Sequence, residues 1–234
     1  MKNTTYEVIA IIPCLNEERF IGGVVDKVIK YVDKVIVVDD GSTDGTAAGA
    51  RDAGAEVISH KTRQGAGAAT RTGLNAAIKY GAAVAVTLDG DGQHNADETP
   101  GVLKPVLEGT ADLVIGSRFL CAAEVPYHRK FGIDIITWLY NVGHRDKIAD
   151  AQSGFRAYSR KALEVIKITY PGFGFSIQSL VQPRKNKLII VEVPISCIYH
   201  DDGSTQDPIT HGLSVAWAVV TIRLREELLG GRKK

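Results

Sequence analysis

Short apolar runs alternate with helix-like segments through the first half of the chain, and this order restricts the fold more than any other feature. The runs are rich in branched side chains, as buried parallel strands are. They lie at residues 8–12, 34–38, 56–59, 83–88 and 113–115. The segments between them, at residues 17–31, 43–53, 65–80 and 96–108, are expected to be helices. The alternation predicts an α/β fold: a doubly wound, mostly parallel sheet with helices on both faces.

The second half of the chain is less regular. We expect a helix near residues 131–144, a loop through 150–156, a helix from Ser159 and a strand at 188–193. Residues 1–210 are expected to form one domain. Residues 211–234 are expected to form an apolar C-terminal helix with a basic end.

Composition excludes several classes of protein. The 234 residues are 44% hydrophobic with a formal net charge of +1, which excludes intrinsic disorder and argues against a nucleic-acid partner. No run reaches the roughly 18–20 apolar residues of a spanning helix, and the N-terminus does not resemble a secretory signal. Cys14, Cys121 and Cys197 are widely spaced and odd in number, which indicates a reducing, cytoplasmic setting.

Two carboxylates follow the expected strand at 83–88. Asp89 and Asp91, separated by one glycine, can converge on Mg²⁺ or Mn²⁺, and Gln93 and His94 come next. The alternative is a solvated acidic turn, which an isolated Asp-x-Asp would favour. The position at a strand end, opposite a second acidic pair, favours the metal site.

That second pair, Asp39 and Asp40, ends the strand at 34–38. We expect Asp39 to bind a nucleobase or ribose and Asp40 to cap the following helix, although both residues also suit a simple turn. Arg118 and Arg129 suit phosphate oxygens, and the acidic cluster favours that role over two surface arginines.

Gly65, Gly67 and Thr70 resemble part of a dinucleotide-binding fingerprint. The third glycine is missing, the motif is not in the first strand–helix unit, and a five-residue loop precedes it. We therefore expect these glycines to let a helix pack closely against the sheet.

Together these motifs resemble those of family 2 glycosyltransferases, which have the nucleotide-sugar-binding GT-A architecture. The stretches that carry the resemblance are residues 12–18, 37–46, 88–94 and 116–119. Residues 152–158 and 192–195 extend the match to the dolichol-phosphate mannose synthase group of polyprenyl-phosphate glycosyltransferases.

The resemblance implies an inverting, metal-dependent transfer of one sugar from GDP-mannose or a UDP-hexose to a polyprenyl (dolichyl) phosphate. It places Pro13, Asn16, Glu17 and Asp39 at the nucleoside, Asp89, Asp91 and Gln93 at the metal and diphosphate, and Arg118 and Arg129 at the acceptor phosphate. An acceptor phosphate is already anionic, so its attack needs no strong general base.

The sequence departs from the family pattern at two positions. Gln178 stands where relatives often carry an acidic residue, which fits a phosphate acceptor better than a hydroxyl. Ile198 stands where some relatives carry an arginine. The alternatives are transfer to a hydroxyl on a saccharide, lipid or small molecule, a nucleotidyltransferase, and a non-catalytic nucleotide-sugar-binding module.

The segment at 211–229 is expected to be a helix that is apolar nearly all round in its first half. It suits a membrane interface, with its basic end near anionic head groups, and it suits packing on the domain or on a second subunit equally well. A polyprenyl acceptor would place the enzyme at the cytoplasmic face of a membrane. It would dock there through this segment, through an anchoring partner or by weak peripheral contact, and a homo-oligomer is a further expectation.

Overall fold

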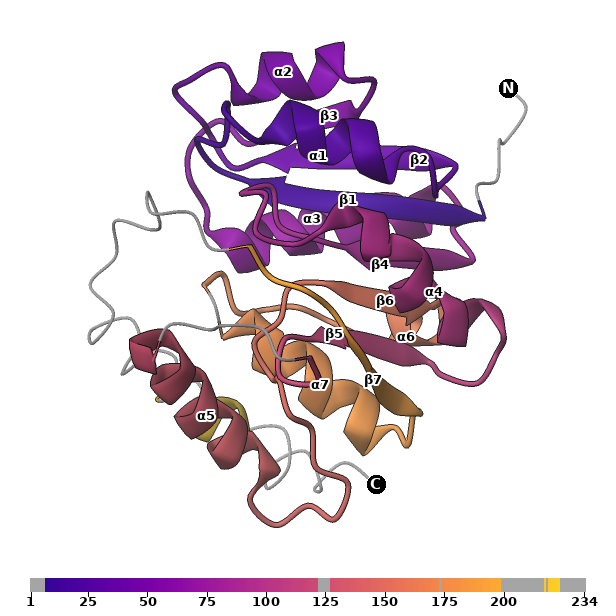
Figure 1. Ribbon diagram of the computed structural model, residues 1–234, viewed down its shortest axis with the longest axis vertical. Coiled ribbons are helices and arrows are strands. Elements are labelled where there is room, and N and C mark those ends of the chain that lie inside the picture. The colour runs from indigo at the N-terminus through magenta and orange to yellow at the C-terminus, as the bar shows by residue number, and fades with distance from the viewer. Residues whose placement is uncertain (1–6, 122–126, 173, 199–216, 218, 224–234) are drawn as a thin grey trace.

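The computed structural model describes residues 7–121, 127–172, 174–198, 217 and 219–223, with side chains omitted for 127–129 and 131. Its strands and helices alternate along most of the chain (Figure 1). The strands are β1 (Val8–Cys14), β2 (Lys34–Asp39), β3 (Glu56–Ser59), β4 (Val84–Thr87), β5 (Leu113–Ser117), β6 (Arg156–Ser159) and β7 (Ile190–Pro194). The helices are α1 (Ile21–Val28), α2 (Thr46–Asp52), α3 (Ala66–Lys79), η1 (Ala96–Glu98), α4 (Thr99–Leu107), α5 (Tyr127–Asn141), α6 (Arg160–Val165) and α7 (Phe175–Lys185).

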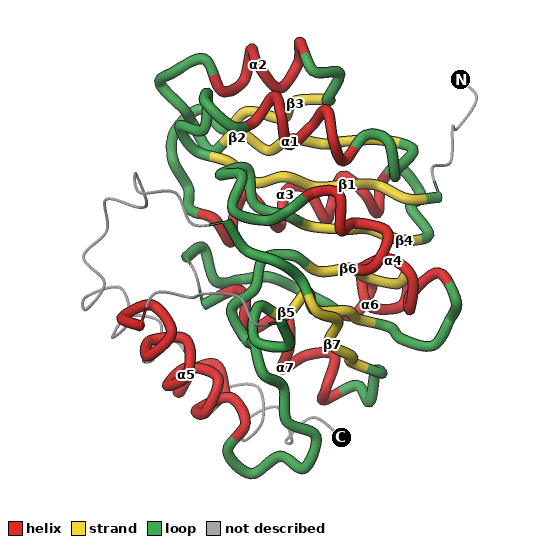
Figure 2. Tube along the Cα trace, in the orientation of Figure 1, coloured by secondary structure: helices red, strands yellow, loops and turns green. Residues whose placement is uncertain are grey.

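The strands form one sheet of seven in the order β3-β2-β1-β4-β6-β5-β7 (Figure 2). Four neighbouring pairs are parallel, and β6 runs antiparallel between β4 and β5. The expected α/β fold with a mostly parallel sheet is therefore confirmed, and the antiparallel strand is an addition to it.

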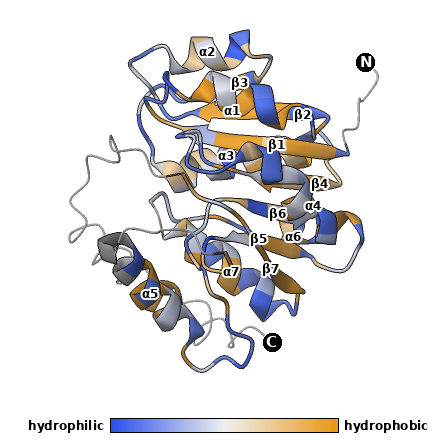
Figure 3. Cartoon of the chain, viewed as in Figure 1, coloured by the Kyte–Doolittle hydropathy of each residue, from blue (hydrophilic) through white to orange (hydrophobic). Residues whose placement is uncertain are grey.

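Both faces of the sheet are buried, which explains the continuous apolar runs. In β1, Ile9 and Ile11 belong to the core cluster that packs against α3 and α7. Ala10 and Ile12 face the opposite cluster, which packs against α1 and α4. Apolar residues predominate along the strands of the sheet (Figure 3). Successive side chains point to opposite faces of a strand, so a strand covered on both sides has few polar positions.

The first strand continues through Pro13, although we expected it to stop there. The carbonyl of Ile11 accepts a hydrogen bond from Leu88 N, so position 11 faces β4, and position 13 faces the same side two residues further on. The last β4 residue in register is Thr87, opposite Ile11. The missing N–H of Pro13 therefore lies beyond the end of its neighbour, where no ladder bond is lost.

Two elements of the second half were not expected. The sequence indicated a loop through 150–156, but Arg156 already begins β6. The α7 helix includes Pro183 near its C-terminal end. Proline has no backbone N–H and therefore removes one helix hydrogen bond. Because Pro183 lies in the last turn, this loss affects only the end of α7. The helix from Ser159 is confirmed as α6, and the Ser159 side chain accepts a hydrogen bond from Ala162 N at 3.2 Å.

Most of the C-terminal segment at 211–229 lies outside the described residues. Trp217 and residues 219–223 are helical, and Val219 and Ile222 are buried in the core cluster that contains Tyr140 of α5. This part of the segment packs on the domain, which was one of the alternatives expected for it. Within the described residues, no helix is long and apolar enough to cross a membrane.

Candidate active site at the carboxyl ends of the strands

The loops after β1 and β2 are tied together by Asn16. Asn16 N donates to Ser42 Oγ at 2.9 Å, and Asn16 Oδ1 accepts from Thr43 N at 2.9 Å. Asn16 has φ 57°, a left-handed conformation that asparagine tolerates better than most residues. Glu17 N donates to Thr46 Oγ1 at 2.7 Å. The expected grouping of polar residues at this edge of the sheet is therefore present.

Asp39 is the last residue of β2. It is buried, it pairs in register with Cys14, and its Oδ1 accepts a hydrogen bond from Ser42 N at 2.9 Å. Burial, with the charge of Asp39 as the next cause, raises the pKa of the Cys14 thiol to about 12. Cys14 is therefore a neutral, buried small side chain.

Asp40 does not cap the helix that follows it, which corrects the expectation. Its carboxylate accepts hydrogen bonds from Gln64 N at 2.9 Å and Gly65 N at 2.7 Å, in the loop before α3. His60 Nδ1 lies 2.7 Å from the same carboxylate. Asp40 therefore holds a distant loop, because a buried carboxylate needs several donors and that loop supplies them.

The glycines at the start of α3 serve a different contact from the one expected. A Cβ on Gly67 would lie 2.2 Å from the carbonyl oxygen of Tyr170. Gly67 N donates to Pro171 O at 2.8 Å. The glycines at 65 and 67 admit the segment at 170–172. Later in α3, Gly73 makes the expected close approach to the sheet, because a Cβ added there would lie 2.2 Å from Ile11 Cγ2. Because Pro171 takes donors of the α3 N-terminus, no dinucleotide phosphate is expected there.

Asp89 and Asp91 lie on the turn after β4. The Asp89 side chain is 45% exposed, and a Cβ on Gly154 would lie 2.5 Å from its Oδ2. Asp91 Oδ1 accepts a hydrogen bond from Gln93 N at 2.9 Å. Loss of hydration at the carboxylate raises the pKa of Asp89, although the charges of the Arg118 and Arg156 guanidinium groups act to lower it.

His94 packs behind Asp89 as a neutral side chain. Burial lowers its pKa to about 4. Its Nδ1 accepts a long hydrogen bond, 3.5 Å, from Asp89 N, and its ring lies 5.5 Å from that of Phe155. His94 therefore supports the position of Asp89 from the protein side.

The carboxylate oxygens at this edge suit a hard divalent cation that also binds a substrate. Within the described part of the chain, no group of three or more His, Cys, Asp or Glu side chains could hold a metal on its own. Mg²⁺ and similar ions commonly take one or two carboxylates and complete their shell with water and substrate phosphate. Burial, followed by the charges of Asp91, Asp44 and Asp89, raises the pKa of Glu17 to about 7. This edge therefore carries unbalanced negative charge that a cation would offset.

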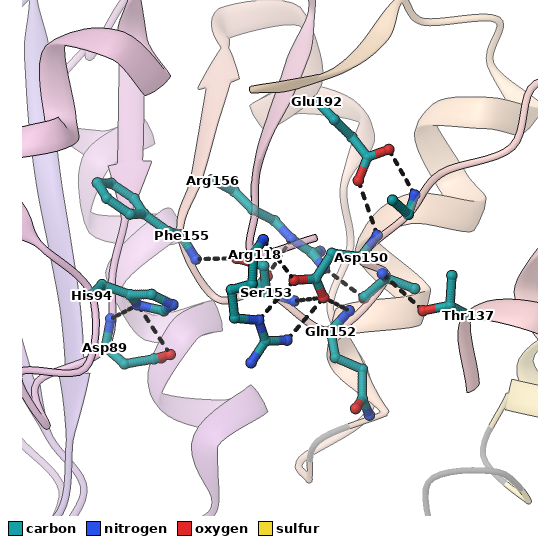
Figure 4. A network of polar contacts seen from close by, with 12 residues as sticks. Asp89, His94, Arg118, Thr137, Asp150, Gln152, Ser153, Phe155, Arg156 and Glu192 are labelled. Carbon is teal, nitrogen blue, oxygen red and sulfur yellow. Dashed lines mark hydrogen bonds and ion pairs between the residues drawn. The ribbon is translucent and has the colours of Figure 1, made fainter. Parts of the chain in front are cut away.

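Arg118, at the end of β5, is held by Asp150 (Figure 4). Its Nε donates to Asp150 Oδ2 at 2.7 Å, and its Nη2 donates to Asp150 Oδ1 at 2.8 Å. Burial acts to raise the pKa of Asp150, but the hydrogen bonds and charge of Arg118 hold it below its ordinary value. Arg129 lies in the first turn of α5, and its side chain is outside the described part, so its role stays a prediction.

Three charged residues around Arg118 were missed as functional candidates. Asp150 and Arg156 flank the Gln-Ser-Gly-Phe stretch, and Glu192 lies on β7. The family resemblance covered the positions of Arg156 and Glu192 but assigned them no role. Gln178, which stands where relatives often carry an acidic residue, holds a loop: its Oε1 accepts from Thr169 N at 2.8 Å.

Comparison with known proteins decides the family. A model described as glycosyl transferase family 2 matches residues 9–167. The chain belongs to this family. It is a glycosyltransferase, and members of its kind transfer sugar from a nucleotide sugar.

Among its relatives is the UDP-N-acetylglucosamine–dolichyl-phosphate N-acetylglucosaminyltransferase of Methanococcus voltae, 34% identical over 81% of this chain and 84% of that protein. The polyprenol monophosphomannose synthase of Mycolicibacterium smegmatis is 34% identical over 82% of this chain and 77% of its own. The undecaprenyl-phosphate mannosyltransferase of Micrococcus luteus is 31% identical over 85% and 86%.

Solved structures support the fold assignment. Glucosyl-3-phosphoglycerate synthase from Mycobacterium tuberculosis, in complex with Mn²⁺, UDP-glucose and phosphoglyceric acid, matches with a TM-score of 0.76 at 22% identity. The match covers 93% of this chain and 79% of that one. At this identity the likeness establishes the GT-A fold, and it does not extend to the acceptor.

Proposed function

We propose that this glycosyltransferase transfers one sugar, with inversion, from a nucleoside-diphosphate sugar to a polyprenyl (dolichyl) phosphate. The observation that carries the proposal is the Arg118 guanidinium, which Asp150 fixes at the same edge of the sheet as the Asp89 carboxylate. A cation site for the donor diphosphate and a guanidinium for a second phosphate then lie at one edge of the sheet, after β4 and β5, with β6 between these two strands. The relatives named above, which act on dolichyl, polyprenol or undecaprenyl phosphates, support this acceptor class.

The proposed roles follow the order of the strand ends. The nucleoside is bound by Pro13, Asn16, Glu17 and Asp39, the metal and diphosphate by Asp89, Asp91 and Gln93, and the acceptor phosphate by Arg118 and Arg129. The relatives' names include both a UDP-N-acetylglucosamine donor and mannose transfer. The proposed donor is accordingly GDP-mannose or a UDP-hexose.

The mechanism relies on orientation more than on proton transfer. A bound Mg²⁺ or Mn²⁺ would neutralise the departing diphosphate. Arg118 would orient the acceptor phosphate oxygen toward the face of the sugar opposite the leaving group, and in-line attack there inverts the anomeric centre. The attacking oxygen is already anionic, so Gln178 at the position of a family acid costs the reaction nothing.

We also propose that the enzyme docks peripherally at the cytoplasmic face of a membrane. Trp138 of α5 is 65% exposed and Trp217 of the C-terminal helix is 69% exposed. Ile135 of α5, Val142 just after α5 and Val220 of the C-terminal helix are exposed apolar residues as well. Exposed tryptophans on helices that pack through their other faces suit the head-group region of a bilayer. A second subunit or an anchoring partner on this surface is the alternative.

Thermal-shift screening of nucleotide sugars with Mn²⁺, followed by product analysis with a polyprenyl phosphate, tests the proposal. We expect one nucleotide sugar to raise the melting temperature and to label a product that partitions into organic solvent. Stabilisation by a nucleotide sugar without any lipid-linked product would instead favour a hydroxyl acceptor.

A further inference from the structure

We propose that Asp150 is a positioning residue, which fixes the Arg118 guanidinium in the orientation that transfer requires, and that Glu192 holds Asp150 in place. The inference deepens the proposed function, because it assumes that Arg118 faces the acceptor. It assigns a role to two buried or half-buried acids that neither bind the cation nor face solvent as surface ion pairs do.

The contact between Asp150 and Arg118 constrains the guanidinium fully. Two parallel hydrogen bonds of 2.7 and 2.8 Å join the guanidinium edge to both carboxylate oxygens. The backbone N of Arg118 lies 3.3 Å from Asp150 Oδ2, so one carboxylate also fixes the main chain at the end of β5. A bidentate pair of this kind sets the plane as well as the position of the guanidinium.

Asp150 is itself held from several directions (Figure 4). The carboxylate of Glu192 accepts hydrogen bonds from Ala149 N at 2.7 Å and Asp150 N at 2.9 Å. Asp150 Oδ1 also accepts from Ser153 N at 3.1 Å. Thr137 of α5 accepts from the next backbone N, that of residue 151, at 3.2 Å. Strand β7 and helix α5 therefore fix the backbone around Asp150, and the loop itself fixes the carboxylate.

The same loop also supports the donor side of the site. Gly154 lies directly behind the Asp89 carboxylate. Arg156, which is fully buried, donates to Ser153 O at 2.8 Å and to Ser179 Oγ on α7 at 2.6 Å. One braced loop thus positions both the guanidinium on the acceptor side and the carboxylate on the donor side. Its rigidity sets the spacing between the two phosphates that react.

A positioning role and a purely electrostatic role predict opposite results for one substitution. Asp150→Asn removes a negative charge beside Arg118, which by charge alone would strengthen attraction to an anionic acceptor and lower its KM. If orientation dominates, the amide can accept only one of the two guanidinium bonds, and the guanidinium swings. A displacement of about 1 Å costs on the order of 10²-fold in rate.

The first test compares steady-state kinetics of Asp150→Asn and Glu192→Gln with polyprenyl phosphate as the varied substrate. We expect kcat to fall by about 10- to 100-fold in Asp150→Asn, with the KM for the nucleotide sugar unchanged, and to fall less in Glu192→Gln. The control is Glu164→Gln, which breaks the exposed Arg160–Glu164 pair on α6 and should match wild type. In an Arg118→Ala background, Asp150→Asn should change kcat by less than about twofold. A wild-type kcat in Asp150→Asn, or a full additional loss in the Arg118→Ala background, would overturn the inference.

The second test needs no acceptor. In ¹⁵N NMR spectra, the Arg118 Nε–H should exchange slowly in wild type and in Glu164→Gln, and rapidly in Asp150→Asn. Slow exchange retained in Asp150→Asn would overturn the inference even if the acceptor were assigned correctly. Rapid exchange in Asp150→Asn, combined with a wild-type enzyme that forms no lipid-linked product, would overturn the proposed acceptor and leave the positioning contact established.

Discussion

Gly154→Ala gives a sharp test of the donor-side geometry, because the three atoms nearest to the new methyl group all belong to the Asp89 carboxylate. Its Cβ would lie 2.5 Å from Oδ2, 2.7 Å from Oδ1 and 2.9 Å from Cγ. Gly154 does not have a positive φ, so alanine fits its backbone. The Thr87 hydroxyl donates to the Gly154 carbonyl at 2.7 Å, which keeps the backbone from moving away. The carboxylate must therefore give way.

The size of the displacement follows from the contact distance. Moving Oδ2 from 2.5 Å to an ordinary carbon–oxygen contact of about 3.4 Å shifts it by about 0.9 Å. Catalytic groups tolerate roughly 0.5 Å, and about 1 Å costs on the order of 10²-fold, or about 2.7 kcal/mol of transition-state stabilisation. The Asp89 side chain is 45% exposed and can turn toward solvent, so we expect the free energy of unfolding to change by less than about 1 kcal/mol.

The assay measures kcat/KM for the nucleotide sugar in saturating Mn²⁺ together with thermal unfolding by circular dichroism. The matched control is Gly23→Ala on α1, where the added Cβ has no neighbour within 4 Å. We expect a loss of about 10²-fold in Gly154→Ala and none in Gly23→Ala, with both proteins stable. A Gly154→Ala enzyme with wild-type kcat/KM would show that Asp89 does not need its position. A large fall in melting temperature with normal turnover would show that the backbone moved instead of the carboxylate.

Three further substitutions test other parts of the site. Asp91→Ala should abolish metal-dependent turnover, because it removes one of the two carboxylates proposed to hold the cation. Unimpaired turnover of this variant in Mg²⁺ would contradict the proposed mechanism. Glu17→Gln should raise the melting temperature at pH 8 in EDTA and raise it much less at pH 5. The pKa of about 7 means that Glu17 is protonated in the folded state at pH 5 and is ionised at pH 8 at a cost in stability; an equal effect at both pH values would contradict this. Replacing Trp138 and Trp217 with serine should abolish flotation with anionic liposomes while melting stays normal, and flotation that persists would remove this surface as the membrane contact.

The fold and the edge that carries the site could be predicted because they depend on local patterns. Branched apolar runs identify strands covered on both faces, and polar residues at their ends gather where parallel strands finish. Asp89 and Asp91 follow β4 directly, and Asn16 links the loops after β1 and β2. Each of these residues lies within a few positions of the strand end that places it.

The network behind the site could not be predicted because its partners are distant in sequence. Asp150 meets Arg118 across 32 positions, and Glu192 reaches Asp150 across 42. The antiparallel strand β6 was missed because it has only four residues and begins with an arginine, which no apolar pattern marks. Arg156 is tolerated in the core only because carbonyl and hydroxyl groups from two elements satisfy it, and only tertiary structure shows those partners.

Asp40 also has hydrogen-bond partners that its sequence neighbourhood does not reveal. Its sequence neighbourhood predicted a cap on the next helix, yet its donors come from residues 24 and 25 positions further on. Local turn chemistry identified the residue as a hydrogen-bond acceptor correctly. It could not identify which donors would reach it, because several loops converge on this edge.

The most direct measurement compares two acceptors that differ only in the phosphate. Wild-type enzyme is incubated with Mn²⁺ and its nucleotide sugar, with either a polyprenyl phosphate or the matching polyprenol, and the organic phase is analysed by mass spectrometry. We expect a sugar-phosphate lipid from the phosphate and no product from the alcohol. Glycosylation of the polyprenol at a comparable rate would contradict the claim that Arg118 orients an acceptor phosphate.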